Sequence, residues 1–219
     1  MQHPSLIAID WGTSSFRLWA ISGGGQVVSR IRNDNGMSKL KPGDYAHVLA
    51  AALTELGIAH TLPTIICGMA GSAQGWMEAP YVDTPASLEH IPLQAVAVPG
   101  TATMVRILPG LAQRKMSAPD VMRGEETLLL GAVLERGVSG TICLPGTHSK
   151  WVTIDEAEVC GFSTSMTGEV FSLLQSHSVL AHSVQQVAGE NDDDEAFQSA
   201  VEEAVSSPEK ILQALFSVR

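Results

Sequence analysis

Residues 7–19, Ile-Ala-Ile-Asp-Trp-Gly-Thr-Ser-Ser-Phe-Arg-Leu-Trp, decide the fold class of this chain. An apolar strand ends in the acid Asp10, and a tight turn containing Gly12 leads into a second strand. Gly12 lets backbone N–H groups approach an anion closely, and three hydroxyl side chains add donors: Thr13, Ser14 and Ser15. This order of parts predicts a phosphate-binding turn between two strands.

Two charged side chains flank this turn. Asp10 ends the first strand, where its carboxylate is placed to hold Mg²⁺ or a magnesium-bound water beside bound phosphates. Arg17 is predicted to add a charge-assisted contact to a transferring phosphoryl group. The structural alternative is an ordinary hairpin in which Asp10 and Gly12 serve only the turn.

The spacing of apolar residues and turn residues predicts an alternating α/β pattern. Strands are expected at residues 6–10, 16–22, 26–31, 64–67 and 95–98, and helices at residues 44–56 and 120–135. Asp44 is expected to cap the first helix, and Gly57 to end it. Residues 77–119 are rich in proline and turn signals. This composition indicates either surface connections or a loop region that covers the substrate.

Further sequence blocks match one family in its order along the chain. They are residues 67–76 (Cys-Gly-Met-Ala-Gly-Ser-Ala-Gln-Gly-Trp), 120–127, 144–151, 166–169 and 215–219. With the first turn, these blocks resemble the 2-dehydro-3-deoxygalactonokinase family, within the superfamily of sugar kinases, heat-shock ATPases and actin. The resemblance implies an α/β, ribonuclease H-like fold of the actin/hexokinase type.

The same resemblance implies two related domains, at residues 1–137 and 138–219. The family continues beyond the point where this sequence stops, so we expect the second domain to be incomplete. A chain of this length is then expected to bind ATP weakly, to have little kinase activity and to associate as a homo-oligomer through uncovered apolar surface.

The first turn has a partial repeat in the second half of the chain. Gly146-Thr147-His148-Ser149 is followed by Trp151, as residues 12–15 are followed by Trp19. The resemblance implies that the two turns face each other across a nucleotide cleft, with phosphate contacts from Gly146, Thr147, Ser149 and Lys150. His148 is a further candidate, for a phosphate contact or for a contact with the substrate. A solvated strand residue at position 150 and a polar turn residue at position 148 are the structural alternatives.

Phosphoryl transfer to an alcohol needs a carboxylate that orients the hydroxyl and accepts its proton. Glu125 is the first candidate, because its place after Gly124 at a helix start resembles the catalytic Gly-Asp-Gln of related sugar kinases. Glu126 and Asp120 are rivals for this role. In the structural alternative, these acids only favour the helix dipole.

The resemblance implies an acidic sugar as substrate, with a carboxylate at one end and the reactive primary hydroxyl at the other. Arg123 is expected to meet that carboxylate, and the sugar is expected to contact Ser72, Gln74 and Trp76. A surface ion pair at Arg123 and a loop packed by Trp76 are the structural alternatives.

Composition excludes some classes of partner. The chain has 219 residues and a net charge of −10, which disfavours nonspecific binding to nucleic acid or anionic membranes. Three cysteines without a Cys-x-x-Cys pair favour neither a disulfide framework nor a zinc site, so reduced and mostly buried thiols are expected. The start of the chain has no signal-peptide pattern and the apolar runs are short, so we expect a cytoplasmic protein.

Two other patterns are weaker signals for metal. His177 and His182 lie five residues apart in a predicted helix, so they do not share the one-turn face on which a metal is usually bound. The acidic run at residues 190–195 lacks the ligand spacing of a calcium loop, and a solvated loop before a helix is the better interpretation.

The resemblance implies ATP-dependent phosphorylation of 2-dehydro-3-deoxy-D-galactonate to its 6-phosphate in galactonate catabolism, with ATP and Mg²⁺ as cofactors. Two alternatives stay open: a non-catalytic sensor of sugar acid or nucleotide on the same fold, and a kinase for another sugar acid.

Overall fold

The computed structural model describes residues 3–101, 104–184 and 194–217. The chain divides into two compact units. Unit 1 comprises Met1–Leu144 and Lys150–Thr164, and unit 2 comprises Pro145–Ser149 and Ser165–Arg219. Each unit is described here by itself. The domain border expected at 137/138 refers to the related domains of the family and stays a prediction.

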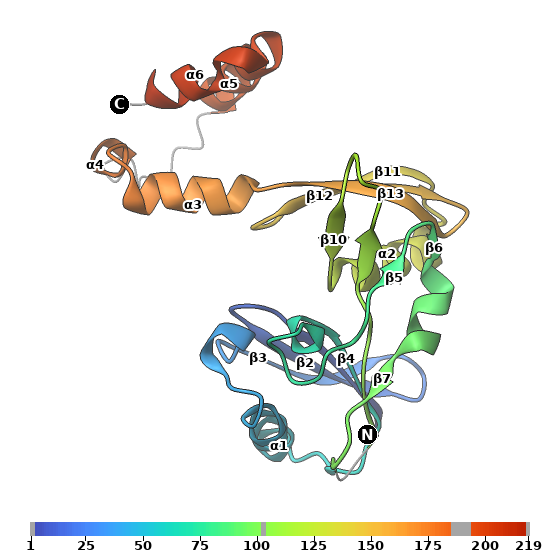
Figure 1. Ribbon diagram of the computed structural model, residues 1–219. Helices are drawn as coiled ribbons and strands as arrows, with labels where there is room; N and C mark the ends of the chain where they lie inside the picture. Colours follow the sequence, from blue (N-terminus) through green and yellow to red (C-terminus); the bar gives the residue numbers. More distant parts are fainter. Residues whose placement is uncertain (1–2, 102–103, 185–193, 218–219) are drawn as a thin grey trace. The chain divides into compact units, whose positions relative to one another are not determined.

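The main sheet of unit 1 has six strands in the order β3-β2-β1-β4-β8-β7 (Figure 1). Strands β1 to β3 are antiparallel, and β4 and β8 run parallel to β1 on its other side. The strands are β1 Pro4–Trp11, β2 Phe16–Ser22, β3 Val27–Asn33, β4 Thr64–Gly68, β7 Val96–Ala97 and β8 Val105–Ile107. This topology confirms the predicted α/β, ribonuclease H-like sheet.

The two faces of this sheet differ because successive side chains of a strand point to opposite sides. One face carries the fully buried residues Ile7, Trp11 and Phe16, and α1 (Tyr45–Glu55) packs against them (Figure 1). Asp44 precedes α1, but its side chain accepts a hydrogen bond from the Lys41 N–H at 2.8 Å rather than capping the helix. The opposite face is left available for the site.

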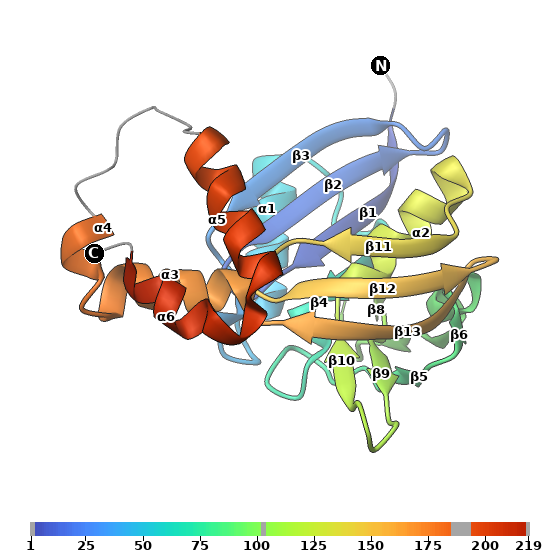
Figure 2. The same cartoon turned by 90° about the horizontal axis from the view of Figure 1, so that it is seen from above.

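A second core in unit 1 lies between two small sheets and α2 (Glu125–Arg136). The sheets have the orders β10-β9-β5 and β11-β12-β13-β6, and Figure 2 shows β11, β12 and β13 side by side. Their bounds are β5 Val82–Asp83, β6 Ala86–Ser87, β9 Leu111–Gln113, β10 Asp120–Met122, β11 Gly140–Leu144, β12 Ser149–Asp155 and β13 Glu158–Ser165. The core itself is formed by side chains such as Leu111, Met122, Leu129 and Val152.

The region at residues 77–119 is more structured than its turn signals indicated. It contributes β5 to β9 and the 3₁₀ segment η3 (Leu88–Gln94). Two shorter 3₁₀ segments, η1 (Met37–Lys39) and η2 (Met69–Gly71), precede it.

The helix predicted at residues 120–135 was wrong at its start. Asp120–Met122 is strand β10, which pairs with β9, and α2 begins only at Glu125. Gly124 separates the two elements with a φ of 107°, a value that L side chains rarely adopt. Pairing between strands distant in sequence therefore overrode the local helical pattern.

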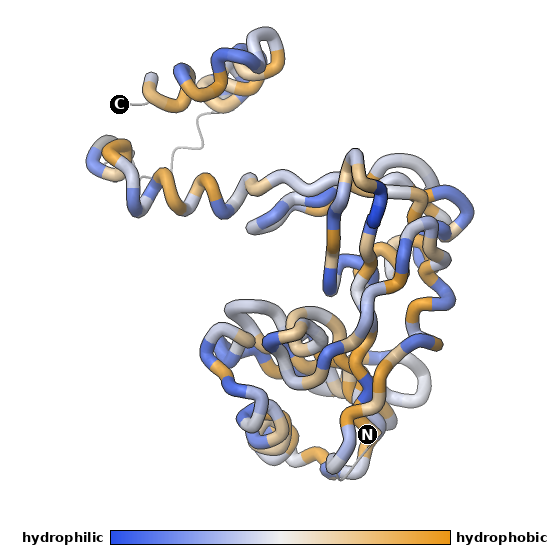
Figure 3. The backbone as a smooth tube through the Cα atoms, viewed as in Figure 1, coloured by the Kyte–Doolittle hydropathy of each residue, from blue (hydrophilic) through white to orange (hydrophobic). Residues whose placement is uncertain are grey.

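Unit 2 is built mainly from helices: α3 Thr167–His177, α4 Ala181–Val184, α5 Asp194–Ser206, η5 Pro208–Lys210 and α6 Ile211–Ser217. His177 ends α3 and His182 lies in α4, so the single helix predicted to hold both was wrong. Figure 3 shows apolar residues recurring along α5 and α6. No helix in the described ranges is long and apolar enough to span a bilayer. Most of the acidic run, residues 190–193, lies outside the described residues.

The three cysteines are free thiols. Cys67 is half-buried, as expected, but Cys143 and Cys160 are exposed, so the expectation of mostly buried thiols was wrong for these two. Both lie on strands of the β11-β12-β13-β6 sheet at positions that point away from the core.

Candidate active site

The register of the main sheet gathers charged side chains on the face opposite α1. Asp10 pairs with Arg17 across β1 and β2 and with Cys67 across β1 and β4, so these three residues are neighbours on that face. The Arg17 guanidinium donates from Nη1 to Asp10 Oδ2 at 2.9 Å, and both side chains remain partly exposed. The two charges predicted to flank the first turn therefore lie together.

The first turn, residues 12–15, is closed by a hydrogen bond from the Gly12 N–H to the Ser15 carbonyl at 2.9 Å. A neighbouring segment supports it, because Met37 N–H donates to the Gly12 carbonyl at 3.0 Å and Ser38 N–H donates to the Thr13 carbonyl at 2.9 Å. The side chains of Thr13 and Ser14 are exposed and available to a ligand.

Gly36 makes this support possible and was missed in the sequence. A Cβ at position 36 would lie 2.3 Å from the backbone carbon of Ser14, so the close approach needs glycine. The Asn35-Gly36 dipeptide is a turn signal, but nothing local indicates that it packs against a turn more than twenty residues earlier in the chain.

A second close approach brings the start of α2 beside Asp10. A Cβ at Gly68, at the end of β4, would lie 3.3 Å from Asp10 Oδ1 and 2.7 Å from the Trp11 carbonyl oxygen. A Cβ at Gly124 would lie 3.4 Å from the Gly68 Cα. The two glycines therefore allow the end of β4 and the start of α2 to meet next to the acid.

The three candidate carboxylates have different surroundings. Glu125 Oε2 accepts a hydrogen bond from the Arg123 N–H at 3.0 Å, and its side chain is half-buried. Glu126 is 1 % exposed, and both its oxygens accept from the Gly124 N–H, at 3.0 and 2.7 Å. Asp120 Oδ1 accepts from the Val121 N–H and from the Thr164 hydroxyl, both at 2.8 Å.

Burial raises the pKa of Glu126 to about 8, and the nearby Glu125 charge adds to this, against hydrogen bonds that lower it. Burial likewise raises the pKa of the Cys67 thiol to about 12, with the charges of Asp10 and Glu126 adding to it. The Cys67 sulfur is therefore a protonated, weakly nucleophilic group at neutral pH.

A cavity of about 660 Å³ lies between the free face of the main sheet and α2. Its polar lining comes from Asp10, Arg17, Arg123, Glu125 and Thr127. Its apolar lining comes from Trp19, Ile21, Val27, Ile65, Leu108 and Leu128. Of the three candidate bases, Glu125 is the one that lines this cavity together with Asp10.

The predicted sugar contacts at residues 72–76 have other partners in the fold. The buried Ser72 hydroxyl donates to Met37 Sδ at 3.2 Å. Trp76 stacks on Tyr45 with ring centroids 5.8 Å apart, as part of the core beside α1. Gln74 is exposed.

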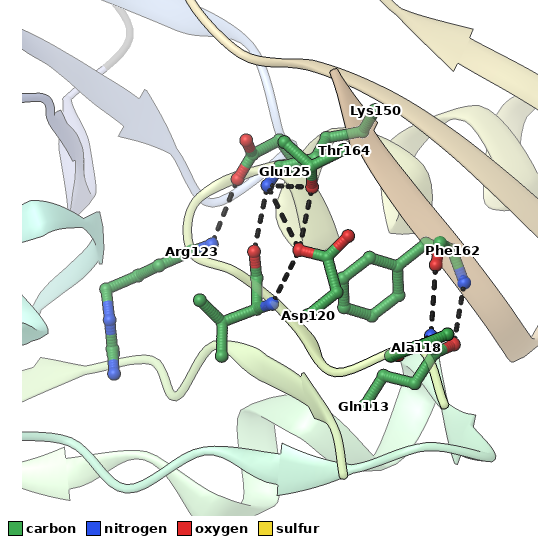
Figure 4. A network of polar contacts seen from close by, with 9 residues as sticks. Gln113, Ala118, Asp120, Arg123, Glu125, Lys150, Phe162 and Thr164 are labelled. Atoms are coloured by element: carbon green, nitrogen blue, oxygen red, sulfur yellow. Dashed lines mark hydrogen bonds and ion pairs between the residues drawn. The ribbon is translucent and has the colours of Figure 1, made fainter. Parts of the chain in front are cut away.

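Arg123 contributes to the cavity, but its guanidinium is held by the protein. Nη2 donates to the Ala79 carbonyl at 2.8 Å, and the guanidinium carbon lies 4.3 Å from the centre of the Tyr81 ring. Nε and Nη1 are buried and have no hydrogen-bond partner among the described residues. Figure 4 shows this side chain extending away from Glu125.

The second turn, residues 146–149, lies in unit 2 and packs against the start of α3. The Ser149 and Thr167 hydroxyl oxygens are 2.5 Å apart, and the Thr167 hydroxyl also contacts the Gly146 carbonyl at 3.4 Å. A Cβ at Gly168 would lie 2.6 Å from the Gly146 carbonyl oxygen, so glycine is required there. The block at residues 166–169 therefore shapes this turn.

A side-chain hydrogen bond completes the contact between the second turn and α3. The His148 Nε2 lies 2.5 Å from Glu169 Oε2, and the Glu169 N–H donates to the Thr147 carbonyl at 3.0 Å. His148 was predicted as a site residue, whereas no role was predicted for Glu169.

Lys150, which follows the second turn, belongs to unit 1 and is 5 % exposed. Its ammonium donates to the Val121 carbonyl at 2.8 Å and to the Thr164 hydroxyl at 2.7 Å. The phosphate contact expected of Lys150 stays a prediction, but its Nζ is already engaged inside the protein.

The described residues contain no cluster of three or more His, Cys, Asp or Glu side chains that could hold a metal ion. Mg²⁺ does not need such a cage, because it is commonly bound through one or two carboxylates together with waters and substrate phosphates. A single partly exposed carboxylate at Asp10, beside the predicted phosphate-binding turn, fits that mode of binding.

A ribonuclease H-like sheet, an acid followed by a Gly-hydroxyl turn, and a carboxylate at the start of α2 form the arrangement expected of a carbohydrate kinase. The family model described as 2-keto-3-deoxy-galactonokinase matches residues 10–219. The chain belongs to that family.

Individual relatives agree with this assignment. The chain is 46 % identical over 213 residues to "Probable 2-dehydro-3-deoxygalactonokinase DgoK1" of Rhizobium meliloti (strain 1021). It is 38 % identical over 213 residues to the 2-dehydro-3-deoxygalactonokinase of Escherichia coli (strain K12). Each alignment covers 97 % of this chain and 70 % of the relative.

The fold is also similar to a crystal structure described as a 2-dehydro-3-deoxygalactonokinase protein from Sinorhizobium meliloti. The TM-score is 0.92 at 46 % identity, and the match covers 98 % of this chain and 70 % of that chain.

Proposed function

We propose that this chain carries the catalytic carboxylates for ATP-dependent phosphorylation of 2-dehydro-3-deoxy-D-galactonate at its terminal hydroxyl, giving the 6-phosphate in galactonate catabolism. The weak ATP binding and low activity expected of the 219-residue chain stay a prediction, which a comparison of its turnover with that of a protein of its relatives' length would test. Membership of the family and the names of its relatives support the substrate. The observation that carries the chemistry is the presence of Asp10 and Glu125 in the lining of one cavity, beside the first turn.

Glu125 is the proposed general base. Its half-buried carboxylate lines the cavity, and the hydrogen bond from the Arg123 N–H fixes one of its oxygens. The two rival carboxylates have other partners. Glu126 accepts a hydrogen bond from the Gly124 N–H, and Asp120 accepts one from the Thr164 hydroxyl. Glu125 would orient the substrate hydroxyl and accept its proton as the oxygen attacks the γ-phosphate.

Asp10 is the proposed ligand of Mg²⁺, directly or through water. When bound, Mg²⁺ would supply positive charge that stabilises the negative charge on the transferring phosphoryl group. Arg17 pairs with Asp10 at 2.9 Å, and its partly exposed guanidinium can also contact the phosphoryl group.

The two turns are proposed to bind the nucleotide phosphates. In the first turn the donors are backbone N–H groups and the exposed Thr13 and Ser14 side chains, with Ser15 closing the turn. In the second turn, Gly146, Thr147 and Ser149 have the corresponding role. In unit 1 the sugar acid is proposed to meet the exposed Gln74, whereas Ser72 and Trp76 are engaged in the fold. The substrate contact expected of His148 stays a prediction.

A comparison of two adjacent carboxylates tests this function. Glu125→Gln should lower kcat by about 10²- to 10⁴-fold and leave KM for the sugar acid nearly unchanged, because it removes proton transfer but keeps a side chain of the same shape. Glu126→Gln is the matched control and should retain turnover, since the amide oxygen can still accept from the Gly124 N–H. A large loss in Glu126→Gln alone would contradict the choice of base.

The substrate is tested with a panel of 2-keto-3-deoxy sugar acids and ATP. The galacto epimer should have the highest kcat/KM. Higher efficiency with another sugar acid would contradict the substrate, and ATP binding without phosphorylation of any of them would favour a sensor.

A further inference from the structure

Lys150 is a buried cation in a polar cluster that joins three strands. Its Nζ donates to the Val121 carbonyl of β10 at 2.8 Å and to the Thr164 hydroxyl of β13 at 2.7 Å, while Lys150 itself lies on β12. The Thr164 hydroxyl in turn donates to Asp120 Oδ1 at 2.8 Å, and that oxygen lies 4.0 Å from Nζ (Figure 4). A buried ammonium is stable only where such partners replace water.

This cluster connects two separate sheets. Strand β10 pairs through its backbone with β9, whereas β12 and β13 belong to the other small sheet. A second polar link lies nearby, in which the Gln113 side chain exchanges hydrogen bonds with the backbone of Phe162 at 3.1 and 3.2 Å. Side chains of both sheets therefore fix the position of β10, and Lys150 supplies the charged part of this connection.

The position of β10 determines where Glu125 begins α2. Only Arg123 and Gly124 separate the end of β10 from Glu125, and the Glu125 carboxylate bonds back to the Arg123 N–H at 3.0 Å. The Lys150 ammonium holds the Val121 carbonyl, four residues before Glu125. A shift of β10 would therefore move Glu125, and a misplacement of about 1 Å in a catalytic geometry can cost about 10²-fold in rate.

We propose that Lys150 is a positioning residue for Glu125, fixing the segment at residues 120–125 through its hydrogen bonds to Val121 and Thr164, and is not a ligand of the nucleotide phosphates. The proposal rests on the proposed role of Glu125 as the base. Lys150 also follows the second turn directly in the chain, so the same residue links a phosphate-binding turn to the segment that carries the base.

Kinetics of Lys150→Met in two backgrounds test this role. In the otherwise unchanged chain, kcat should fall by about tenfold or more, with KM for ATP and for the sugar acid changing by less than about threefold. In the Glu125→Gln background, the same substitution should lower the residual single-turnover rate by less than about threefold. If Lys150 acts through Glu125, the effects of the two substitutions are not additive, because the carboxylate that Lys150 positions is already absent. Equal losses in both backgrounds, or a loss mainly in KM for ATP, would overturn the proposal.

Removing Lys150 alone leaves Asp120, whose side chain is only 17 % exposed, without its nearest cation, which can prevent folding. The double variant Lys150→Met with Asp120→Asn removes both charges and should fold while keeping the loss of kcat and the non-additivity with Glu125→Gln. A double variant with normal kcat would also overturn the proposal. Normal kcat in Glu125→Gln by itself would instead overturn the proposed function, so the two failures are distinguishable.

Discussion

The buried carboxyl of Glu126 should make the stability of unit 1 fall as the pH rises. Its pKa is about 8 in the fold, against 4.5 as the ordinary value. Between these two values the folded chain keeps a proton that the unfolded chain has released, so the free energy of unfolding decreases with increasing pH across this window. Compared with a side chain that never ionises, Glu126 lowers the free energy of unfolding by about 1 kcal/mol at pH 5 and by about 4 kcal/mol at pH 8.

Glu126→Gln removes this titration, since a glutamine stays neutral and its amide oxygen can still accept from the Gly124 N–H. The difference in unfolding free energy between the variant and the original chain should therefore shift by about 3 kcal/mol in favour of the variant from pH 5 to pH 8. Urea unfolding followed by tryptophan fluorescence at several pH values measures this shift. A constant difference between the two chains across the window would refute a protonated Glu126 in the fold.

Glu125→Gln provides the matched control for that measurement. Glu125→Gln keeps the buried Glu126 carboxyl, so the unfolding free energy of this variant should still fall between pH 5 and pH 8, as in the original chain. An unpaired amide N–H of the new glutamine would change the free energy of unfolding by the same amount at every pH. It would therefore not affect the change of this free energy with pH, on which the prediction rests.

Three further substitutions should act on the site through its geometry. Asp10→Asn should lower kcat by about 10²-fold or more and change the magnesium dependence without altering the circular dichroism spectrum, whereas near-normal turnover would contradict its role. Gly36→Ala places a Cβ 2.3 Å from the backbone of the first turn and should weaken ATP binding by about tenfold, measured by titration, while Gly43→Ala, with open space around its Cβ, should not. Gly168→Ala places a Cβ 2.6 Å from the second turn and should likewise weaken ATP binding, and Gly131→Ala, with no atom within 4 Å of its Cβ, is the control that should leave it unchanged.

The sequence was sufficient to determine the first half of the main sheet. Alternating apolar residues and the turn at Gly12 predicted strands at residues 6–10 and 16–22, and the structure has them at Pro4–Trp11 and Phe16–Ser22. The helix predicted at residues 44–56 is observed at Tyr45–Glu55. These elements were predictable because side-chain alternation and turn residues act over a few neighbouring positions.

Only the tertiary structure determined where α2 starts and how Trp76 is used. The apolar residues of Asp120–Met122 and of the segment that follows recur at helical spacing. Asp120–Met122 nevertheless forms β10, because its backbone pairs with that of β9. Trp76 lies in a segment whose residues suggested a sugar wall, but its ring stacks on Tyr45 in the core. Neither partner is close in the sequence, so no local pattern could indicate the contact.

The choice among the acids and the role of Lys150 also depended on distant contacts. Glu125 and Glu126 are chemically identical neighbours, and only the packing of α2 against the rest of unit 1 leaves the first in the cavity lining and buries the second at 1 % exposure. Lys150 follows a predicted phosphate-binding turn in the sequence, but its ammonium donates hydrogen bonds to the Val121 carbonyl and the Thr164 hydroxyl. A sequence identifies which groups can carry charge, whereas the surrounding strands and helices determine which of them reach a ligand, because burial is a property of the whole fold.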